Sequence, residues 1–162
     1  MKKILLLIIG ITIVILENTI TNYIDLLGIS FNLLIIYITI ISLYLDKLEI
    51  GIIAAILGLI RDITVGGIFG LNGTILFFIA YCISHLSDKI YKENYITILV
   101  LIFTTTLFDS MINIGVVGEL YVVDSIELRI IRGILIYPFI NGLMGVLVYR
   151  LSKKSIVKLK ES

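Results

Sequence analysis

The stretch IGIIAAILGLIRDITVGGIFGLNG, residues 50–73, contains the features on which the fold depends. Its first eleven residues are apolar or small, and they form only about 17 Å of α-helix, which is short for a hydrocarbon core of about 30 Å. Arg61 and Asp62 close this run. If the helix continues to a turn at Gly66 and Gly67, it spans a thinned bilayer with both charged residues near the hydrocarbon boundary. We favour this interpretation.

Apolar runs occupy the rest of the chain on both sides of this stretch. Of 162 residues, 59% are hydrophobic and 15% are charged, whereas a soluble domain has about 25% charged residues. The apolar surface must face lipid, where every backbone polar group needs a partner inside the protein, so we expect an all-α membrane protein. The sequence predicts a single domain, residues 1–162, folded as a bundle of six transmembrane helices. The spans are expected at residues 4–24, 29–45, 49–65, 68–86, 95–117 and 128–151.

The distribution of basic residues predicts the orientation, because Lys and Arg are retained on the cytoplasmic side of short loops. With six spans and both termini in the cytoplasm, ten basic residues lie inside and three outside. The ten are Lys2, Lys3, Lys47, Lys89, Lys92, Arg150, Lys153, Lys154, Lys158 and Lys160, and the three are Arg61, Arg129 and Arg132. A re-entrant hairpin in place of spans three and four gives the same distribution and is the open alternative.

Two carboxylates are expected inside the membrane. Counted from the outer ends of their helices, Glu17 and Asp109 lie roughly 10 to 12 Å deep, and Arg132 enters the last span about 6 Å deep. A carboxylate near the bilayer centre costs at least about 2.5 kcal/mol, so we expect these three side chains to meet, with Arg61 and Asp62 on the same side. The result would be a polar cavity in the outer half of the bundle that binds a partner segment, a lipid headgroup or a small solute. The alternative is a purely structural cluster of ion pairs or protonated carboxylates.

Small residues in the central stretch indicate close contact between helices. Gly51 and Ala55 form one pair with small-xxx-small spacing, and Ala54 and Gly58 form another. Such pairs let two helix backbones approach. We expect them to pack against another helix of the same chain rather than against a second copy.

Glycine, proline and asparagine mark two expected irregularities. The turn at residues 66–67 is followed by Gly70, since glycine tolerates backbone conformations closed to other residues, and Asn72 is placed to cap the helix that follows. In the last span, Pro138 is expected to kink the helix near Asn141, whose side chain would satisfy a backbone group freed by the proline.

The sequence offers no candidate catalytic centre. Cys82 is the only cysteine and His85 the only histidine, so an intramolecular disulfide is impossible and a zinc site has no adjacent ligands. No phosphate-binding loop or nucleophile motif occurs. A net charge of +1 also gives no basic surface for nucleic acid. We therefore predict no enzyme activity, no cofactor and no metal.

Residues 58–73, GLIRDITVGGIFGLNG, closely resemble the signature of the rod shape-determining MreD family. In that signature a Gly-Leu-x-x-Asp helix end runs into a Gly-rich turn and a Gly-Leu-Asn helix start. Phe31 and Asn32 stand where the family often has Pro-Asn at the start of span two, and Glu17 stands where glutamine is common. The resemblance covers nearly the whole chain and is sharpest from about residue 51 to residue 81.

The resemblance implies a non-enzymatic inner-membrane component of the bacterial cell-elongation machinery. Such a component works with the bitopic protein MreC, the actin-like filament MreB, and the peptidoglycan polymerase and transpeptidase of the lateral wall. The family fold is thought similar to that of the six-span substrate components of energy-coupling-factor transporters. By analogy, the outer half of the bundle and the turn at residues 66–73 would contact partner segments or membrane lipids, and Asp62 would be the first residue to test.

The alternative function is a substrate-binding membrane subunit of a vitamin or metal transporter of that class. Such subunits bind solute near the outer face, which also fits the predicted charge distribution. Against it, span one has no Ala-xxx-Ala face for a coupling subunit, and few aromatic residues lie near the predicted cavity. A membrane scaffold with unrelated partners is a third possibility, and gene neighbours would distinguish the three.

Overall fold

The computed structural model describes residues 2–21, 31–65, 68–92, 94–120 and 131–161, and every regular element in these ranges is helical. The α-helices are α1 (Lys2–Leu16), α2 (Leu33–Ser42), α3 (Lys47–Val65), α4 (Leu71–Leu86), α5 (Tyr95–Leu120) and α7 (Tyr137–Glu161). Three short segments differ in helix type: the π-helices η1 (Glu17–Thr21) and η3 (Arg132–Ile136), and the 3-10 helix η2 (Ser87–Lys89). The all-α fold class is thus confirmed for the described residues, and the six membrane crossings stay a prediction.

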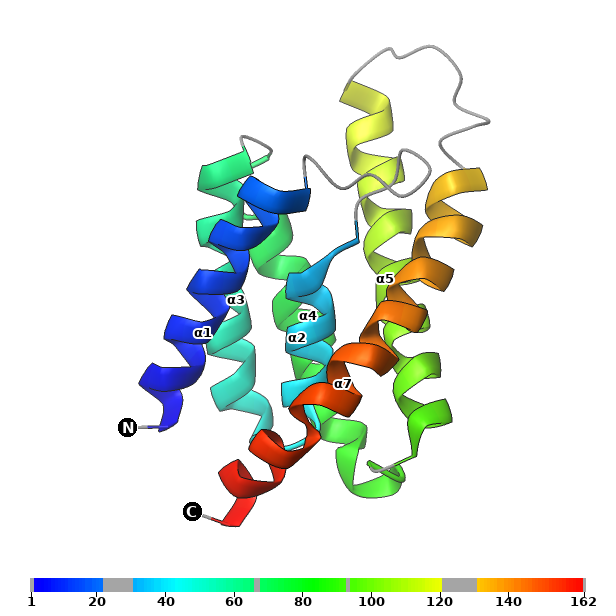
Figure 1. Ribbon diagram of the computed structural model, residues 1–162. Coiled ribbons are helices and arrows are strands. Elements are labelled where there is room, and N and C mark those ends of the chain that lie inside the picture. Colours follow the sequence, from blue (N-terminus) through cyan, green and yellow to red (C-terminus); the bar gives the residue numbers. More distant parts are fainter. Residues whose placement is uncertain (1, 22–30, 66–67, 93, 121–130, 162) are drawn as a thin grey trace.

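The helices run up and down between two ends of a bundle (Figure 1). We call the end where α1 begins and α7 finishes the lower end, as it is drawn in Figure 1. The connections from α2 to α3 and from α4 to α5 also lie there, whereas α3 meets α4 at the opposite, upper end. This alternation agrees with the order of spans expected from the sequence.

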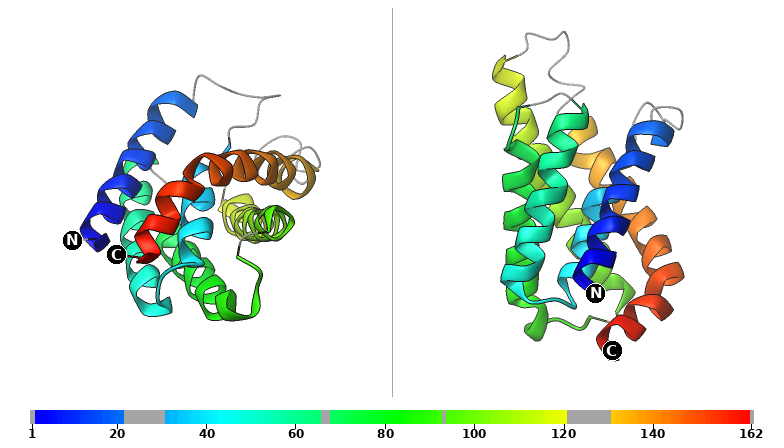
Figure 2. Two further views of the ribbon diagram at one scale, coloured as in Figure 1. Left: turned by 60° about the horizontal axis from the view of Figure 1, so that its bottom comes forward. Right: turned by 90° about the vertical axis from the view of Figure 1, so that its left-hand side faces the viewer.

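Helix α2 lies at the centre of the bundle (Figure 2) and contacts α1, α3, α4, α5 and α7. Eight of its ten residues are buried. At about 15 Å it is shorter than the expected span at 29–45. The physical reason is a cap at its start, where the Asn32 side chain accepts a hydrogen bond from the backbone N–H of Ile35 at 3.0 Å, and a turn that follows Ser42.

The antiparallel pair of α3 and α4 has the most extensive helix contact among the described residues. Gly58 makes this approach possible, since a Cβ there would lie 2.6 Å from the carbonyl oxygen of Asn72 and from the backbone of Gly73. A Cβ on Gly51 would lie 3.0 Å from the Phe77 ring. The expectation that the small residues of α3 pack within the chain is confirmed for these two glycines.

Two clusters of buried apolar side chains meet at α2. One joins α1, α2, α3 and α4, and the other joins α2 to α4, α5 and α7. The α2 residues of the first cluster are Leu34, Ile35, Ile38 and Ile41, and those of the second are Ile36 and Ile40. Because α2 contributes to both, it is the element around which the two halves of the bundle pack.

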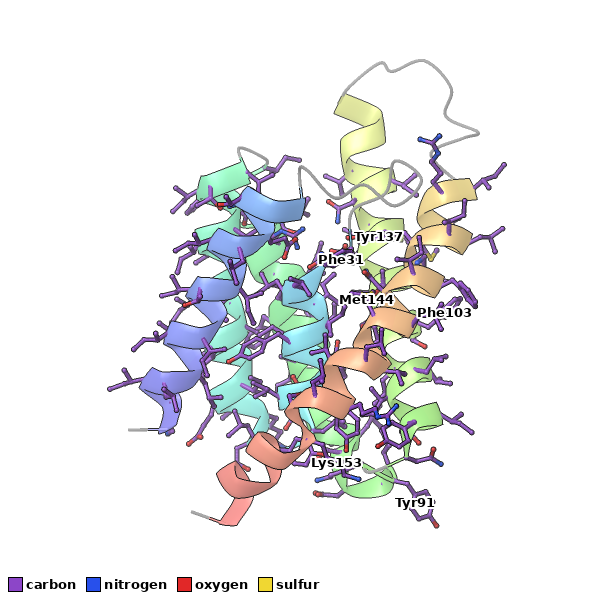
Figure 3. All side chains as sticks on the ribbon, in the orientation of Figure 1. Phe31, Tyr91, Phe103, Tyr137, Met144 and Lys153 are labelled. Atoms are coloured by element: carbon purple, nitrogen blue, oxygen red, sulfur yellow. The ribbon has the colours of Figure 1, made fainter. Side chains whose placement is uncertain are left out.

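Two of the described helical segments, Tyr95–Val116 and Arg132–Lys153, are long and apolar enough to cross a membrane. Their outer faces carry exposed large apolar side chains such as Phe108 and Phe139. Figure 3 also shows side chains that project outward along α1. On this helix, Ile4 and Leu5 are more than half exposed. Contiguous apolar surface of this kind is disfavoured in water and accepted by lipid.

Candidate functional site

Asp62 holds the junction between α3 and α4. It lies in the last turn of α3 and is 3% exposed. Its carboxylate accepts hydrogen bonds from the backbone N–H groups of Gly70 at 2.9 Å, Asn72 at 3.3 Å and Gly73 at 3.4 Å, and from the Asn72 side-chain amide at 2.7 Å. The first N–H groups of a helix have no partner within that helix, and a negative charge there also interacts favourably with the helix dipole. Asp62 therefore caps α4 from the preceding helix.

The expectation that Asn72 caps α4 is wrong. The residue before the first turn is Gly70, which makes no side-chain cap bond and has a φ of 91°, a conformation that glycine adopts without strain. A side-chain cap acts from that position, whereas Asn72 is already the second residue of the helix. Asn72 instead donates its amide to Asp62. Gly66 and Gly67, the other predicted turn residues, lie outside the described residues.

A second group of polar side chains surrounds the start of α2 in the upper half of the bundle. We call it the upper polar cluster, and it consists of Glu17, Asn32, Arg61, Thr106, Asp109, Asn113, Tyr137 and Asn141. Tyr137 is labelled in the upper half of the bundle in Figure 3. Glu17 is the first residue of η1, and Tyr137 follows η3 directly. Both π-helices thus adjoin the cluster, and π-helical turns often occur at functional sites.

An ion pair between α3 and the end of α1 is the centre of this cluster. Arg61 Nη2 lies 3.0 Å from Glu17 Oε1, and the two side chains are only 17% and 11% exposed. The other carboxylate oxygen of Glu17 accepts the backbone N–H of Leu34 at 3.1 Å. Glu17 therefore joins three parts of the chain: η1, α3 and the first turn of α2.

The structure brings Asp109 to the same place. It is 6% exposed, accepts a hydrogen bond from the Asn113 amide at 3.1 Å, and lies within electrostatic range of Arg61 and Glu17. Arg132 does not join them: it is exposed at the start of η3. The expectation that Arg132 meets the two carboxylates is therefore wrong. A guanidinium at the end of a helix can reach water, whereas Arg61 in the bundle interior needs a buried anion.

The cluster also contains Asn32 and Asn141, and sequence reasoning assigned neither of them to it. Asn141 accepts the backbone N–H of Asn32 at 2.9 Å and donates to Thr106 Oγ1 at 3.3 Å. It therefore ties α7 to α2 and α5 instead of satisfying a group freed by Pro138. Both asparagines are almost completely buried. The available signal was a polar side chain inside or beside an apolar run, since such residues in membrane helices usually have polar partners.

Two donors of the cluster are unsatisfied. Arg61 Nη1 and Asn32 Nδ2 are buried and have no hydrogen-bond partner within the described part of the chain. A buried donor without an acceptor costs roughly 1–3 kcal/mol, so such groups generally contact water or a ligand atom. Both side chains have the Tyr137 side chain as a polar neighbour.

These observations define a class: a helical membrane protein whose buried ionisable groups join helix ends. Within the described residues, no group of three or more His, Cys, Asp and Glu side chains could hold a metal ion. The family model for rod shape-determining protein MreD matches residues 1–155, so the chain belongs to the MreD family and has a role in rod shape determination. The resemblance seen in residues 58–73 is thereby confirmed. MreD proteins are a shape-determining family of membrane proteins, not a known enzyme family.

No curated protein matches the chain, and no solved structure matches it. The expected similarity to the substrate components of energy-coupling-factor transporters stays a prediction.

Proposed function

We propose that this protein is a non-enzymatic scaffold subunit of the bacterial cell-elongation machinery. It binds MreC and links it to MreB and to the polymerase and transpeptidase that build the lateral wall. The observation that carries this proposal is the MreD family match over residues 1–155. The protein acts by presenting a rigid helical surface inside the membrane rather than by chemistry of its own.

The proposed orientation is multi-pass in the cytoplasmic membrane, with the lower end of the bundle and both termini in the cytoplasm. The positive-inside rule supports it, because basic residues concentrate at the lower end. The described ones are Lys3, Lys47, Lys89, Lys92, Arg150 and Lys153, whereas Arg132 is exposed at the upper end.

The proposed contact surface for MreC is the upper end of α3 and α4. Large apolar side chains are exposed there, with Ile63 and Phe69 both 69% exposed. Asp62, Gly70 and Asn72 give this junction its shape, and we propose the same role for Gly66 and Gly67. Exposed apolar groups on a rigid frame suit the docking of a partner's transmembrane helix, because little conformational entropy is lost.

The upper polar cluster supports this surface through contacts inside the bundle. Glu17, Arg61 and Asp109 hold η1 and α5 against α3, so we propose that they position the docking surface rather than contact MreC directly. Arg132, exposed at the same end, is proposed as a direct contact to a partner segment or a lipid headgroup.

Replacement of Asp62 by Asn tests the proposal. The amide keeps one acceptor oxygen and loses the charge, so the start of α4 should be destabilised by about 1–3 kcal/mol. In cells that make the protein at its normal level, we expect rounded cells and reduced co-purification of MreC.

Thr104→Ala is the matched control, since Thr104 is exposed on α5, away from the α3–α4 junction, and its hydroxyl donates to the Val100 carbonyl of its own helix. It should leave cell shape and MreC recovery unchanged. Normal rods and full MreC recovery with D62N, at normal protein level, would show that the role proposed for Asp62 is wrong.

A further inference from the structure

A pocket of about 450 Å³ opens at the lower end of the bundle, away from the upper polar cluster. One wall is the turn from α2 to α3 and the first turn of α3, with Tyr44, Asp46 and Glu49, and the other is the end of α4 and η2, with His85 and Ser87. Pockets that bind small groups commonly measure about 300–1,000 Å³. The size is therefore sufficient for a side chain or a short peptide segment.

Hydrogen bonds hold the walls in place. Ser84 Oγ donates to the Leu45 carbonyl at 2.6 Å, which ties the two walls together. Tyr149, completely buried on α7, donates to the Lys92 carbonyl at 3.0 Å and contacts the Tyr44 hydroxyl at 3.2 Å. The pocket is thus preformed, and a ligand would lose little energy in organising it.

The helix ends around the pocket favour a cation. The C-terminal ends of α2 and α4 both lie at its edge, against one N-terminal end, that of α3, and helix C-termini carry partial negative charge. Three carboxylates and two ammonium groups line it: Asp46, Glu49 and Asp88, with Lys47 and Lys92.

Two of these carboxylates already have partners. Glu49 pairs with Lys3 at 2.6 Å, and Asp88 lies 3.6 Å from Lys92. Asp46 makes no ion pair with any described residue. It is therefore the carboxylate available to an incoming cation.

Ser87 gives an independent indication of a ligand. The residue is 6% exposed and lines the pocket, yet its hydroxyl has no hydrogen-bond partner in the described part of the chain. Because the hydroxyl oxygen is itself reachable from the pocket, it can bond to a molecule that enters. A hydroxyl in this position is suited to accept a hydrogen bond from a donor that enters the pocket.

We propose that this pocket binds the ammonium or guanidinium group of a basic residue in the cytoplasmic segment of a membrane-protein partner. Such a group carries several donors, which suit the Asp46 carboxylate, the Ser87 hydroxyl and the carbonyl groups of the α2–α3 turn. Lys and Arg are abundant at the cytoplasmic ends of membrane spans, so a partner beside this protein presents them at this depth. The inference rests on the proposed orientation and scaffold role.

The lining favours a peptide over an aminophospholipid. Only Leu43 and Leu45 of the lining residues are aliphatic, so the acyl chains of a lipid would find little apolar wall. An extended polar segment that inserts one basic side chain has no acyl chain to bury, so it does not need an apolar wall.

Binding of a synthetic probe peptide tests the inference without any partner protein. The full chain is placed in phosphatidylcholine nanodiscs, and fluorescence anisotropy is measured with a labelled hexapeptide of alternating Arg and Ser, compared with one of alternating Gln and Ser. We expect only the Arg peptide to bind. Asp46→Asn should weaken it about tenfold or more, since a charged hydrogen bond is lost, while Asn still suits the residue before α3.

Two control substitutions, one for size and one for charge, are made at Tyr91. This residue is 85% exposed at the same end and does not line the pocket. Ser87→Trp should block binding by filling the space, and Tyr91→Trp should not. Tyr91→Lys changes the net charge by the same amount as Asp46→Asn and should have little effect.

Three results would overturn the inference: equal binding of the two peptides, equal weakening by D46N and Y91K, or competition by phosphatidylethanolamine that removes all peptide binding. The last would make a lipid amine the occupant. Because MreC is absent from the experiment, these outcomes are independent of the Asp62 test of the scaffold role.

Discussion

Arg61 and Asp62 are neighbours in the sequence that serve different helices. Asp62 accepts four hydrogen bonds from the start of α4, whereas Arg61 pairs with Glu17 at the end of α1. Successive side chains on a helix point about 100° apart, so one dipeptide can reach two different neighbours. These two residues therefore connect α3 to two other parts of the chain at the upper end.

Removal of Arg61 should lower the free energy of unfolding more than removal of Glu17. Arg61→Met leaves both Glu17 and Asp109 buried without the cation, and breaking a buried pair in this way costs about 3–5 kcal/mol. Glu17→Gln leaves Arg61 beside Asp109, so its cost should be smaller. In the double variant, Glu17→Gln should recover part of the stability lost with R61M. The measurement is unfolding of the purified protein in mixed micelles with increasing SDS.

Lys3→Met serves as the control, because the Lys3–Glu49 pair is more exposed and such pairs contribute about 0–1 kcal/mol. Equal costs for K3M and R61M would mean that Arg61 is solvated rather than part of a buried ion pair.

Helix α2 shows how a short element can be central. It is too short to cross a bilayer by its α-helical part, but its first turn is held by Asn32, Glu17 and Asn141. Buried polar groups satisfy the N–H groups that a helix end leaves free, so α2 can begin inside the bundle. The polar cluster is therefore part of the fold as well as a candidate functional site.

Gly58 should be the least replaceable glycine of α3. Gly58→Ala places a Cβ 2.6 Å from backbone atoms of α4, and backbone cannot rotate away as a side chain can, so α3 and α4 must separate. We expect a loss of about 1–3 kcal/mol or more, measured by the same SDS unfolding.

Gly115→Ala on α5 is the matched control, because a Cβ there meets nothing within 4 Å. In a helix this change should be neutral or stabilising by up to about 1 kcal/mol. A similar loss in both variants would contradict close backbone packing at Gly58.

The bundle as a whole places most of the described basic residues and both chain ends on one side. Single cysteines in a Cys82→Ser background test this arrangement, since Cys82 is exposed. Phe69 at the upper end and Tyr91 at the lower end are 69% and 85% exposed. With the proposed six spans, a membrane-impermeant maleimide should label F69C in intact spheroplasts and Y91C only after permeabilisation. Labelling of both from the same side would exclude the six-span arrangement.

The fold class and the family were predictable because both depend on local properties of the chain. Apolar runs of helical length require helices in lipid, and the sequence from Gly58 to Gly73 matches a family signature directly. That Glu17, Asp109 and Arg61 lie toward the same end of the bundle was also predictable, since the position of a residue along a helix follows from counting at about 1.5 Å per residue.

The contacts between these groups were not predictable from counting. Arg61 rather than Arg132 pairs with Glu17, and Asp62 rather than Asn72 caps α4. The rotation of each helix about its axis and the choice of its neighbours come from packing with other helices, as at Gly58 and around α2. A linear sequence states where along its helix a side chain lies, but the packed bundle selects the partner that it meets.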